Sequence, residues 1–195
     1  KEAPDVVVIQ EATPGWMAQL GPLHGEYLHR IAEPRDDPFG IALYSKLPMD
    51  SAAVNDSVPM GFPEIIVRLA VKGGTLNLIT THPMPPIGAG NYSSRNLQLD
   101  GIGKLASRTP GPLVLIGDLN TTMWAHHYRR LVATSGLRNV RKGFGVKPTW
   151  PLFMPFAMIP IDHCLVSDDI KVTAFETGPA IGSDHLPIIV SLALD

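Results

Sequence analysis

Short runs of apolar and β-branched residues recur along the chain, and they predict a protein built largely from strands. The runs cover residues 6–9, 40–45, 64–71, 75–82, 113–118 and 186–194. Runs of this length and composition are typical of strands that bury at least one face. The third and fourth runs are separated only by a short segment around Gly73-Gly74, so we expect them to form an antiparallel hairpin.

Three segments between or after these runs have the features of helices. Thr13-Pro14 is a good pair of N-cap and first-turn residues for a short helix. Ser93-Ser94 predicts the start of a longer helix, which has apolar residues at helical spacing and ends at Pro110-Gly111. A third helix is predicted from His126 to Ser135. Together the strands and helices predict a mixed α/β layered domain.

The composition fits one compact domain. The 195 residues are 45% hydrophobic and 17% charged, which is enough to bury a substantial core. Prolines and glycines fall mainly between the predicted elements, and we identify neither a repeat nor a linker. We therefore predict a single domain over residues 1–195.

The net charge and the cysteine content exclude few classes of function. The formal net charge of -2 gives no overall attraction to a polyanion, so binding to nucleic acid would require a local basic patch. Cys164 is the only cysteine, so no intrachain disulfide can form. The chain has no apolar run near the roughly 18–20 residues that span a bilayer, and its first residues lack the features of a signal peptide. These features leave the cellular compartment open.

Polar residues of catalytic types occur where the apolar runs end. Residues at strand ends are held by a rigid scaffold and are well placed to line a cleft. The candidates are Glu11, His82, Asp118, Asn120, Asp162, Asp184 and His185. Strand alternation would put the side chains of Asp118 and Asn120 on one face if the strand geometry continued. Taken singly, each motif also fits turn chemistry, because Asp, Asn, Ser and Gly favour turns.

The order of these motifs resembles that of a known superfamily. The chain contains five motifs in this order: Q-E at 10–11, T-H-P at 81–83, G-D-L-N at 117–120, I-D-H at 161–163 and G-S-D-H-L-P-I at 182–188. The series resembles the motif set of the endonuclease/exonuclease/phosphatase superfamily, the deoxyribonuclease-I-like proteins. The resemblance implies a four-layered α/β sandwich, in which two mixed, mostly antiparallel sheets pack face to face with helices outside. It also implies an active site at one edge, where the strand-end loops converge.

The same resemblance implies a divalent-metal-dependent hydrolase acting on phosphate esters. Such a reaction needs cations to neutralise charge, an activated water and help for the leaving oxygen. Glu11 would be the main metal carboxylate, and Asp184 would be a second contributor. Hard oxygen ligands of this kind suit Mg²⁺ or Mn²⁺.

The remaining motif residues receive roles around the phosphate from this resemblance. His185 would take a proton from the attacking water or orient it, while Asp118 and Asn120 would position that water and the phosphate oxygens. His82 would bind a phosphate oxygen or protonate the leaving group, with Asp162 holding its ring in the required tautomer. General acid–base help of this kind is worth about 10²–10⁴-fold in rate.

Other positions carry weaker assignments. Some family members have a carboxylate near the position of Glu64 that orients the second histidine of the site. Thr149-Trp150 resembles a pair that often precedes I-D-H in relatives, and both packing and shaping of the site rim are open for it. Cys164 is expected to be a small buried hydrophobic residue. Packing or surface positions are expected for the other histidines, which are His24, His29, His126, His127 and His163.

Two loops, 83–92 and 150–160, should flank the cleft if the resemblance holds. The second has no charged residue. If exposed, it would indicate a membrane surface, a lipid-like substrate or a partner, and the alternative is a loop folded onto the sheet. A basic stretch from Arg129 to Lys147 gives some support to a nucleic-acid substrate, with a solvated surface as the alternative. The abasic-site repair branch has a tyrosine near the position of His82, which favours the deoxyribonuclease, sphingomyelinase and inositol-phosphatase branches.

The start of the chain departs from the family pattern. Relatives begin with a strand that carries an Asn for the metal or phosphate, then a helix, and only then the Q-E segment. We therefore expect both pieces upstream of Lys1, as in bacterial relatives of unknown substrate whose extensions carry membrane helices that would anchor the protein. The leading hypothesis is a nuclease-like phosphodiesterase. The alternatives are a lipid or inositol phosphoesterase and a non-catalytic interaction domain that retains the fold.

Overall fold

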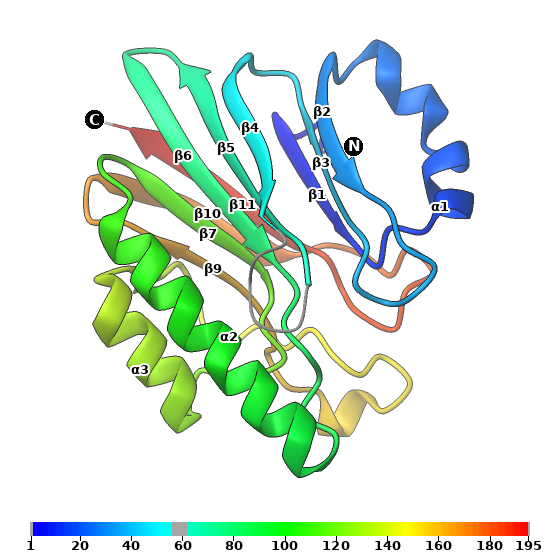
Figure 1. The fold of residues 1–195 in the computed structure, drawn as a ribbon, viewed down its shortest axis with the longest axis vertical. Helices are drawn as coiled ribbons and strands as arrows, with labels where there is room; N and C mark the ends of the chain where they lie inside the picture. The colour runs from blue at the N-terminus through cyan, green and yellow to red at the C-terminus, as the bar shows by residue number, and fades with distance from the viewer. Residues whose placement is uncertain (1, 56–61, 195) are drawn as a thin grey trace. The chain divides into compact units, whose positions relative to one another are not determined.

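The computed structural model describes residues 2–55 and 62–194 (Figure 1). The chain forms two compact units. The first unit covers Lys1–His82 and the second covers Pro83–Asp195. Both combine helices with strands, as the sequence predicts. The single domain over residues 1–195 stays a prediction.

The first unit contains two groups of antiparallel strands. One is a three-stranded sheet in the order β1-β3-β2, made by β1 (Val6–Gln10), β2 (His29–Glu33) and β3 (Ile41–Ser45). The other is a ladder in the order β4-β5-β6, made by β4 (Met49–Asn55), β5 (Glu64–Val71) and β6 (Gly74–Thr81). The predicted hairpin of β5 and β6 is confirmed, and Gly73 with φ +94° supplies the left-handed residue in its turn.

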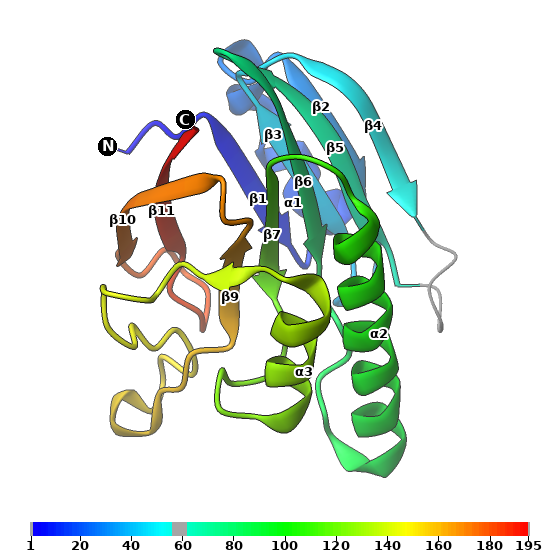
Figure 2. The same ribbon diagram turned by 90° about the vertical axis from the view of Figure 1, so that its left-hand side faces the viewer.

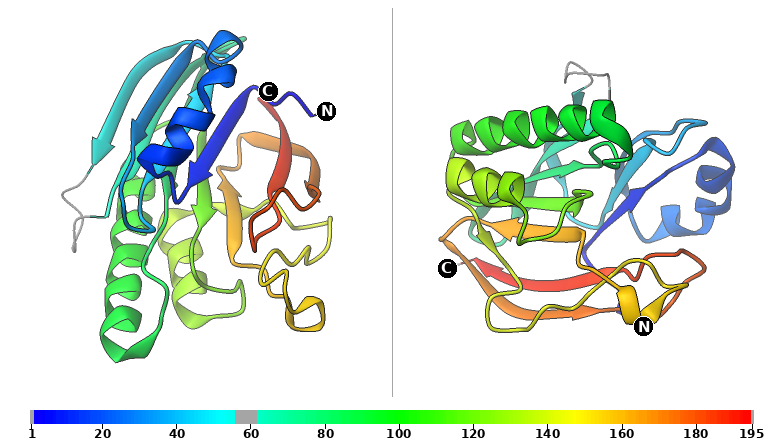
Figure 3. Two further views of the ribbon diagram at one scale, coloured as in Figure 1. Left: turned by 90° about the vertical axis from the view of Figure 1, so that its right-hand side faces the viewer. Right: turned by 90° about the horizontal axis from the view of Figure 1, so that it is seen from below.

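A small apolar core joins the first sheet to the helices that follow β1. Helix α1 (Pro14–Gln19) begins at Thr13, whose Oγ1 accepts the backbone N–H of Trp16 as predicted for an N-cap. A 3₁₀ helix, η1 (Gly21–Gly25), follows it directly. Figure 3 shows these helices beside the strands of the same unit. The buried side chains between them belong to Ala12, Tyr27, Ala42 and Tyr44, with Met17, Leu20 and Leu23 packed against them.

The second unit places a pair of helices beside further antiparallel strands (Figure 2). Its strands are β7 (Leu113–Asp118), β8 (Arg138–Asn139), β9 (Asp162–Val166), β10 (Ile170–Thr177) and β11 (Ile188–Leu194). β9 pairs with both β7 and β8, and β10 pairs with β11. Helices α2 (Gly88–Arg108) and α3 (His126–Ser135) contact each other where Gly103 faces Leu131 and Thr134. A short 3₁₀ helix, η2 (Pro155–Ala157), interrupts the loop before β9.

The structure changes some predicted boundaries. Helix α2 starts at Gly88 rather than after Ser93-Ser94, because those hydroxyls bond to carbonyls one turn back within the helix instead of capping it. Strands β2, β4, β8 and β10 were not predicted. β4 has few β-branched residues and owes its extended form to pairing with β5. Within the described part of the chain, no helix is both long and apolar enough to cross a membrane.

Candidate active site

The ends of β7 and β9 bring two carboxylates together. Asp118 closes β7 and Asp162 opens β9, and the antiparallel register places these residues directly opposite each other. Side chains at opposed positions lie close enough to interact, and like charges there repel. The pair therefore favours a cation or a protonated group beside it.

His185 supplies a titratable ring at this pair. It lies in the loop before β11, and its Nδ1 is 2.8 Å from Oδ2 of Asp162, while its Nε2 is 3.9 Å from Oδ2 of Asp118. Burial by itself lowers the pKa of His185. The hydrogen bond to Asp162 and the negative charges of Asp162, Asp118 and Asp184 outweigh that effect, so the pKa is raised above its ordinary value.

The partner of Asp162 corrects one predicted role. The sequence analysis gave Asp162 the task of holding the ring of His82, but the structure bonds its carboxylate to His185. The buried ring of His82 instead has its Nδ1 3.1 Å from the carbonyl oxygen of Pro38. Because a carbonyl oxygen only accepts, Nδ1 of His82 carries the proton. A backbone group, which sequence patterns do not mark, thus selects the tautomer of His82.

Asn120 lies close to Asp118, although not by strand alternation. β7 ends at Asp118, and Asn120 adopts a left-handed conformation with φ +48°. Its backbone N–H donates to Oδ1 of Asp118 at 2.7 Å, and its Nδ2 donates to the carbonyl of Pro83 at 2.9 Å. Arg95 of α2 donates to the carbonyl of Asn120 at 2.7 Å. The strand geometry does not continue to Asn120, because an Asx-type turn begins at Asp118.

Asp184 and Trp150 lie on the rim beside His185, and Thr149 is buried next to the start of β9. The indole Nε1–H of Trp150 donates to Oδ2 of Asp184 at 2.9 Å, and the Trp150 and His185 ring centroids are 6.2 Å apart. The fully buried Thr149 accepts the backbone N–H of Ile161 at 3.3 Å and that of Asp162 at 3.4 Å through Oγ1. Thr149 therefore supports Asp162, and Trp150 lies on the rim.

One group of side chains in the second unit could hold a metal ion. Ligand atoms of Asp118, Asp162 and His185 all lie within 4.8 Å of one another. Two carboxylates supply the oxygen donors that Mg²⁺ and Mn²⁺ prefer, so the donor set fits a hard divalent cation. Asp184, predicted as a metal ligand, has one carboxylate oxygen bonded to Trp150.

Glu11, the predicted main metal carboxylate, belongs to the first unit and is exposed. Its backbone is left-handed with φ +57°. The next residue, Ala12, donates to the carbonyl of Gly40 at 2.9 Å and accepts from the N–H of Arg35 at 3.0 Å. A Cβ on Gly40 would lie 2.0 Å from the carbonyl oxygen of Ala12, so only glycine allows this approach. The backbone on one side of Glu11 is thus tightly held.

The Q-E and T-H motifs meet inside the first unit. Nε2 of Gln10 donates to the carbonyl of Thr81 at 2.9 Å, which joins the residue before Glu11 to the residue before His82. Glu64 lies opposite Thr81 in the ladder, and its Oε2 accepts Nδ2 of Asn55 at 3.1 Å. Burial raises the pKa of Glu64 to about 7.

The basic stretch is largely occupied by contacts within the protein. Arg141 is 4% exposed, so it is not part of a solvated surface. Arg130 forms an ion pair with Asp100, and Arg138 lies 3.6 Å from Asp168. These contacts weaken the prediction of a nucleic-acid patch here.

Arg141 and His163 are the functional candidates that the sequence analysis missed. His163 has no exposed surface, and burial together with the charge of Arg141 lowers the pKa of His163 to about 3. The ring is therefore neutral. The sequence signal that could have identified His163 is its place next to Asp162 in the I-D-H motif. Cys164 is buried, and burial raises its thiol pKa to about 12, so the prediction of an inert apolar cysteine is confirmed.

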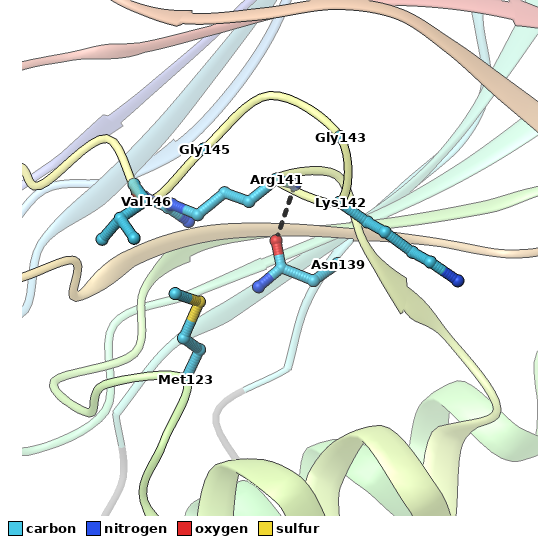
Figure 4. A pocket seen from close by; sticks show the side chains of 7 residues that line it. All are labelled: Met123, Asn139, Arg141, Lys142, Gly143, Gly145 and Val146. Carbon is cyan, nitrogen blue, oxygen red and sulfur yellow. Dashed lines mark hydrogen bonds between the residues drawn. The ribbon is translucent and has the colours of Figure 1, made fainter.

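Two surface features lie outside the carboxylate–histidine group. The uncharged loop 150–160 is exposed at its tip, where Phe153 is 69% and Phe156 is 89% exposed, so the alternative of a loop folded onto the sheet does not hold there. An open pocket of about 350 Å³ lies beside Arg141 (Figure 4). Its lining residues are Met123, Asn139, Arg141, Lys142, Gly143, Gly145 and Val146.

Comparison with solved structures shows the fold. An endonuclease/exonuclease/phosphatase from Beutenbergia cavernae DSM 12333 has a TM-score of 0.80 at 22% identity, covering 99% of this chain and 63% of that chain. This chain thus spans 63% of the length of the Beutenbergia protein. D. rerio TDP2 complexed with single strand DNA product has a TM-score of 0.80 at 17% identity, covering 97% and 86%. Sphingomyelinase C from Streptomyces griseocarneus has a TM-score of 0.66 at 18% identity, covering 95% and 85%.

These likenesses confirm the predicted deoxyribonuclease-I-like fold. A search of curated proteins found no match. The model of the Endonuclease/Exonuclease/phosphatase family matches residues 1–185, which includes every predicted site residue. The chain therefore belongs to the Endonuclease/Exonuclease/phosphatase family.

Proposed function

We propose that the protein is a divalent-metal-dependent phosphodiesterase with a nuclease-like reaction. The observation that carries this proposal is the placement of His185 between Asp162 and Asp118, at 2.8 and 3.9 Å. Asp162 accepts a hydrogen bond from Nδ1–H, so the lone pair of a neutral His185 is on Nε2. That nitrogen is the atom available to a water molecule.

In this mechanism His185 removes a proton from the attacking water. Asp162 fixes the ring and stabilises the imidazolium that forms. The raised pKa of His185 makes it a stronger base than an ordinary imidazole. The 3.9 Å between Nε2 and Asp118 exceeds a hydrogen bond, and a water between them would contact both groups. Asp118 then orients the water towards phosphorus.

A divalent metal ion completes the proposal. Asp118 and Asp162 would hold a divalent cation. The role of Glu11 as a metal carboxylate stays a prediction from the sequence. When bound, such an ion neutralises phosphate charge and lowers the pKa of a coordinated water. For His82, contact with a phosphate oxygen or the leaving group also stays a prediction, and the carbonyl of Pro38 holds its Nδ1.

The experiment is metal-dependent hydrolysis of bis(p-nitrophenyl) phosphate. Activity should be lost with EDTA, return with Mg²⁺ or Mn²⁺, and fall in Asp162→Asn and His185→Gln. His126→Gln, a change at an exposed helix residue, is the matched control. Absence of turnover, or full activity in both site variants, would contradict the enzymatic proposal and favour a non-catalytic interaction domain. Parallel assays on single-stranded DNA, plasmid DNA, sphingomyelin and phosphoinositides then identify the substrate class.

Nucleic acid is the first choice of substrate, and lipid or inositol phosphate is the second. The likeness to TDP2 with a single strand DNA product supports the first. The second is favoured by the exposed Phe153 and Phe156 in an uncharged loop, since exposed aromatic residues of this kind insert into membrane interfaces. A Phe153→Ser/Phe156→Ser variant separates the two. A lipid enzyme should lose vesicle binding and hydrolysis yet cleave the soluble diester normally, whereas a nuclease should be unaffected.

A further inference from the structure

Arg141 is a buried arginine that binds neutral groups from several segments of the second unit. Nε donates to the carbonyl of Val146 at 2.7 Å, and Nη2 donates to the carbonyl of Asp162 at 2.7 Å. Nη1 lies 3.3 Å from Nδ1 of His163, and the guanidinium lies 4.8 Å from the centre of the Phe175 ring. Burying a charge is costly unless it is well bonded, so each of these contacts matters for the fold around Arg141.

The contacts fix the tautomer of His163. Its Nε2 is 2.8 Å from the carbonyl oxygen of Thr121, and a carbonyl only accepts, so Nε2 carries the proton. Nδ1 is then the acceptor, and it receives the N–H of Arg141. Arg141 therefore keeps His163 in the form that donates to Thr121.

Through these bonds the guanidinium of Arg141 is connected to the end of β7 and to the start of β9. It holds the carbonyl of Asp162 directly, at the start of β9. Through His163 it holds the carbonyl of Thr121, the residue that follows the turn from Asp118 to Asn120. Asp118 and Asp162 are also register partners, so their backbones are tied on two sides.

We propose that Arg141 is a positioning residue for this reaction: through His163 and the backbone of Asp162 it sets the separation of the Asp118 and Asp162 carboxylates around His185. The inference rests on the proposed function for its kinetic consequence. The hydrogen bonds of Arg141 to His163 and Asp162 do not depend on that function.

An arginine suits this task better than an apolar residue or a lysine. An apolar side chain of similar volume could fill the space and even stabilise a core, but it would leave the carbonyls and His163 without a donor. A lysine has one ammonium, which cannot present donors in several directions of one plane as a guanidinium does. Replacing Arg141 should therefore change the geometry of the candidate site more than the stability of the fold.

The kinetic test compares Arg141→Met and Arg141→Lys with Arg138→Met. Arg138 is a matched control, since it bonds to Ile170 and Asp168 and not to the site residues. We expect kcat to fall about 10²-fold in Arg141→Met, because misplacement of catalytic groups by about 1 Å has that effect. KM should change little, and Arg141→Lys should lie between Arg141→Met and wild type. A kcat in folded Arg141→Met equal to that of Arg138→Met would overturn the proposal.

A spectroscopic test does not require turnover. In ¹⁵N-histidine-labelled wild-type protein, His163 should show a single Nε2–H tautomer and His185 a hydrogen-bonded Nδ1–H. Arg141→Met should give mixed tautomers for His163 and a shifted or lost Nδ1–H signal for His185, while Arg138→Met keeps both. Unchanged signals in Arg141→Met would also overturn the proposal. Wild-type protein that shows these signals but no turnover would contradict the proposed function, while the positioning role of Arg141 would stand.

Chemical rescue covers the case in which Arg141→Met does not fold. Arg141 lines the open pocket of Figure 4, which gives a small cation a route to the vacated space. Added guanidinium should restore part of the lost kcat, and the Nε2–H signal of His163, in Arg141→Ala, but should not affect Arg138→Ala. If Arg141→Ala is also unfolded, Arg141→Lys decides: wild-type kcat and wild-type histidine signals in that variant would contradict the inference.

Discussion

Asp162 and His185 form a hydrogen-bonded pair in which Oδ2 of the carboxylate lies 2.8 Å from Nδ1 of the ring. The two residues are far apart in sequence, and β9 and the loop before β11 bring them together. The same carboxylate faces Asp118 across the β7–β9 ladder. One acidic residue thus connects the candidate base to the candidate metal site, and the effect of changing it can be predicted.

Asp162→Asn should reduce kcat by on the order of 10²–10⁴-fold, the range for loss of general acid–base help. An amide can donate to Nδ1 and so stabilise the wrong tautomer of His185, and it cannot neutralise an imidazolium. Steady-state hydrolysis of a soluble diester measures the change. Asp169→Asn, at an exposed turn, is the control and should keep wild-type kcat. Equal rates in the two variants would remove Asp162 from the mechanism.

The pH dependence of kcat/KM should report the raised pKa of His185. A base must be neutral to act, so activity should be lost as pH falls through the pKa of His185. Asp162→Asn removes a hydrogen bond and a charge that raise the pKa, so the midpoint of its residual activity should move to lower pH. An identical acid limb in wild type and Asp162→Asn would show that another group titrates.

Glu64 should make the fold less stable as pH rises. Its pKa is about 7 in the folded protein and 4.5 in the unfolded chain, so the unfolded chain loses the proton first. The free energy of unfolding should therefore fall between pH 4.5 and 7, by about 3 kcal/mol at most at 1.36 kcal/mol per pKa unit.

Urea unfolding over this pH range, compared with Glu64→Gln, measures the contribution of Glu64. Glutamine keeps an acceptor for Asn55 but does not titrate, so only the wild-type protein should lose this part of its stability. Parallel stability curves for the two proteins would mean that the carboxyl ionises normally in the fold.

Gly40→Ala should destabilise the protein by about 2–4 kcal/mol, because the added Cβ would clash with the carbonyl of Ala12 and move the backbone next to Glu11. Gly21→Ala is the matched control, since nothing lies within 4 Å of a Cβ there. Thermal and urea unfolding of both variants gives the comparison. A Gly40→Ala protein as stable as Gly21→Ala would be inconsistent with the close approach in the structure.

Local sequence determined the elements that need only their own residues. The apolar runs at 64–71 and 75–82, with Gly73 between them, specify a hairpin because alternation and turn chemistry act over a few residues. Thr13-Pro14 specifies the start of α1 in the same way. The order of the motifs from Gln10 to Ile188 also indicated the family and its fold, and residues 1–185 match the family model.

The tertiary structure decided which of the predicted site residues form hydrogen bonds with one another. No local rule distinguishes His185 from His82 as the ring held by Asp162, because the choice depends on the β7–β9 register and on where the loop before β11 returns. The carbonyl of Pro38 and the guanidinium of Arg141 act through backbone groups and burial, which leave no pattern in the sequence. The sequence by itself thus determined the chemical groups and the fold that holds them, whereas packing decided their pairing, because hydrogen bonds depend on distances that only the folded chain establishes.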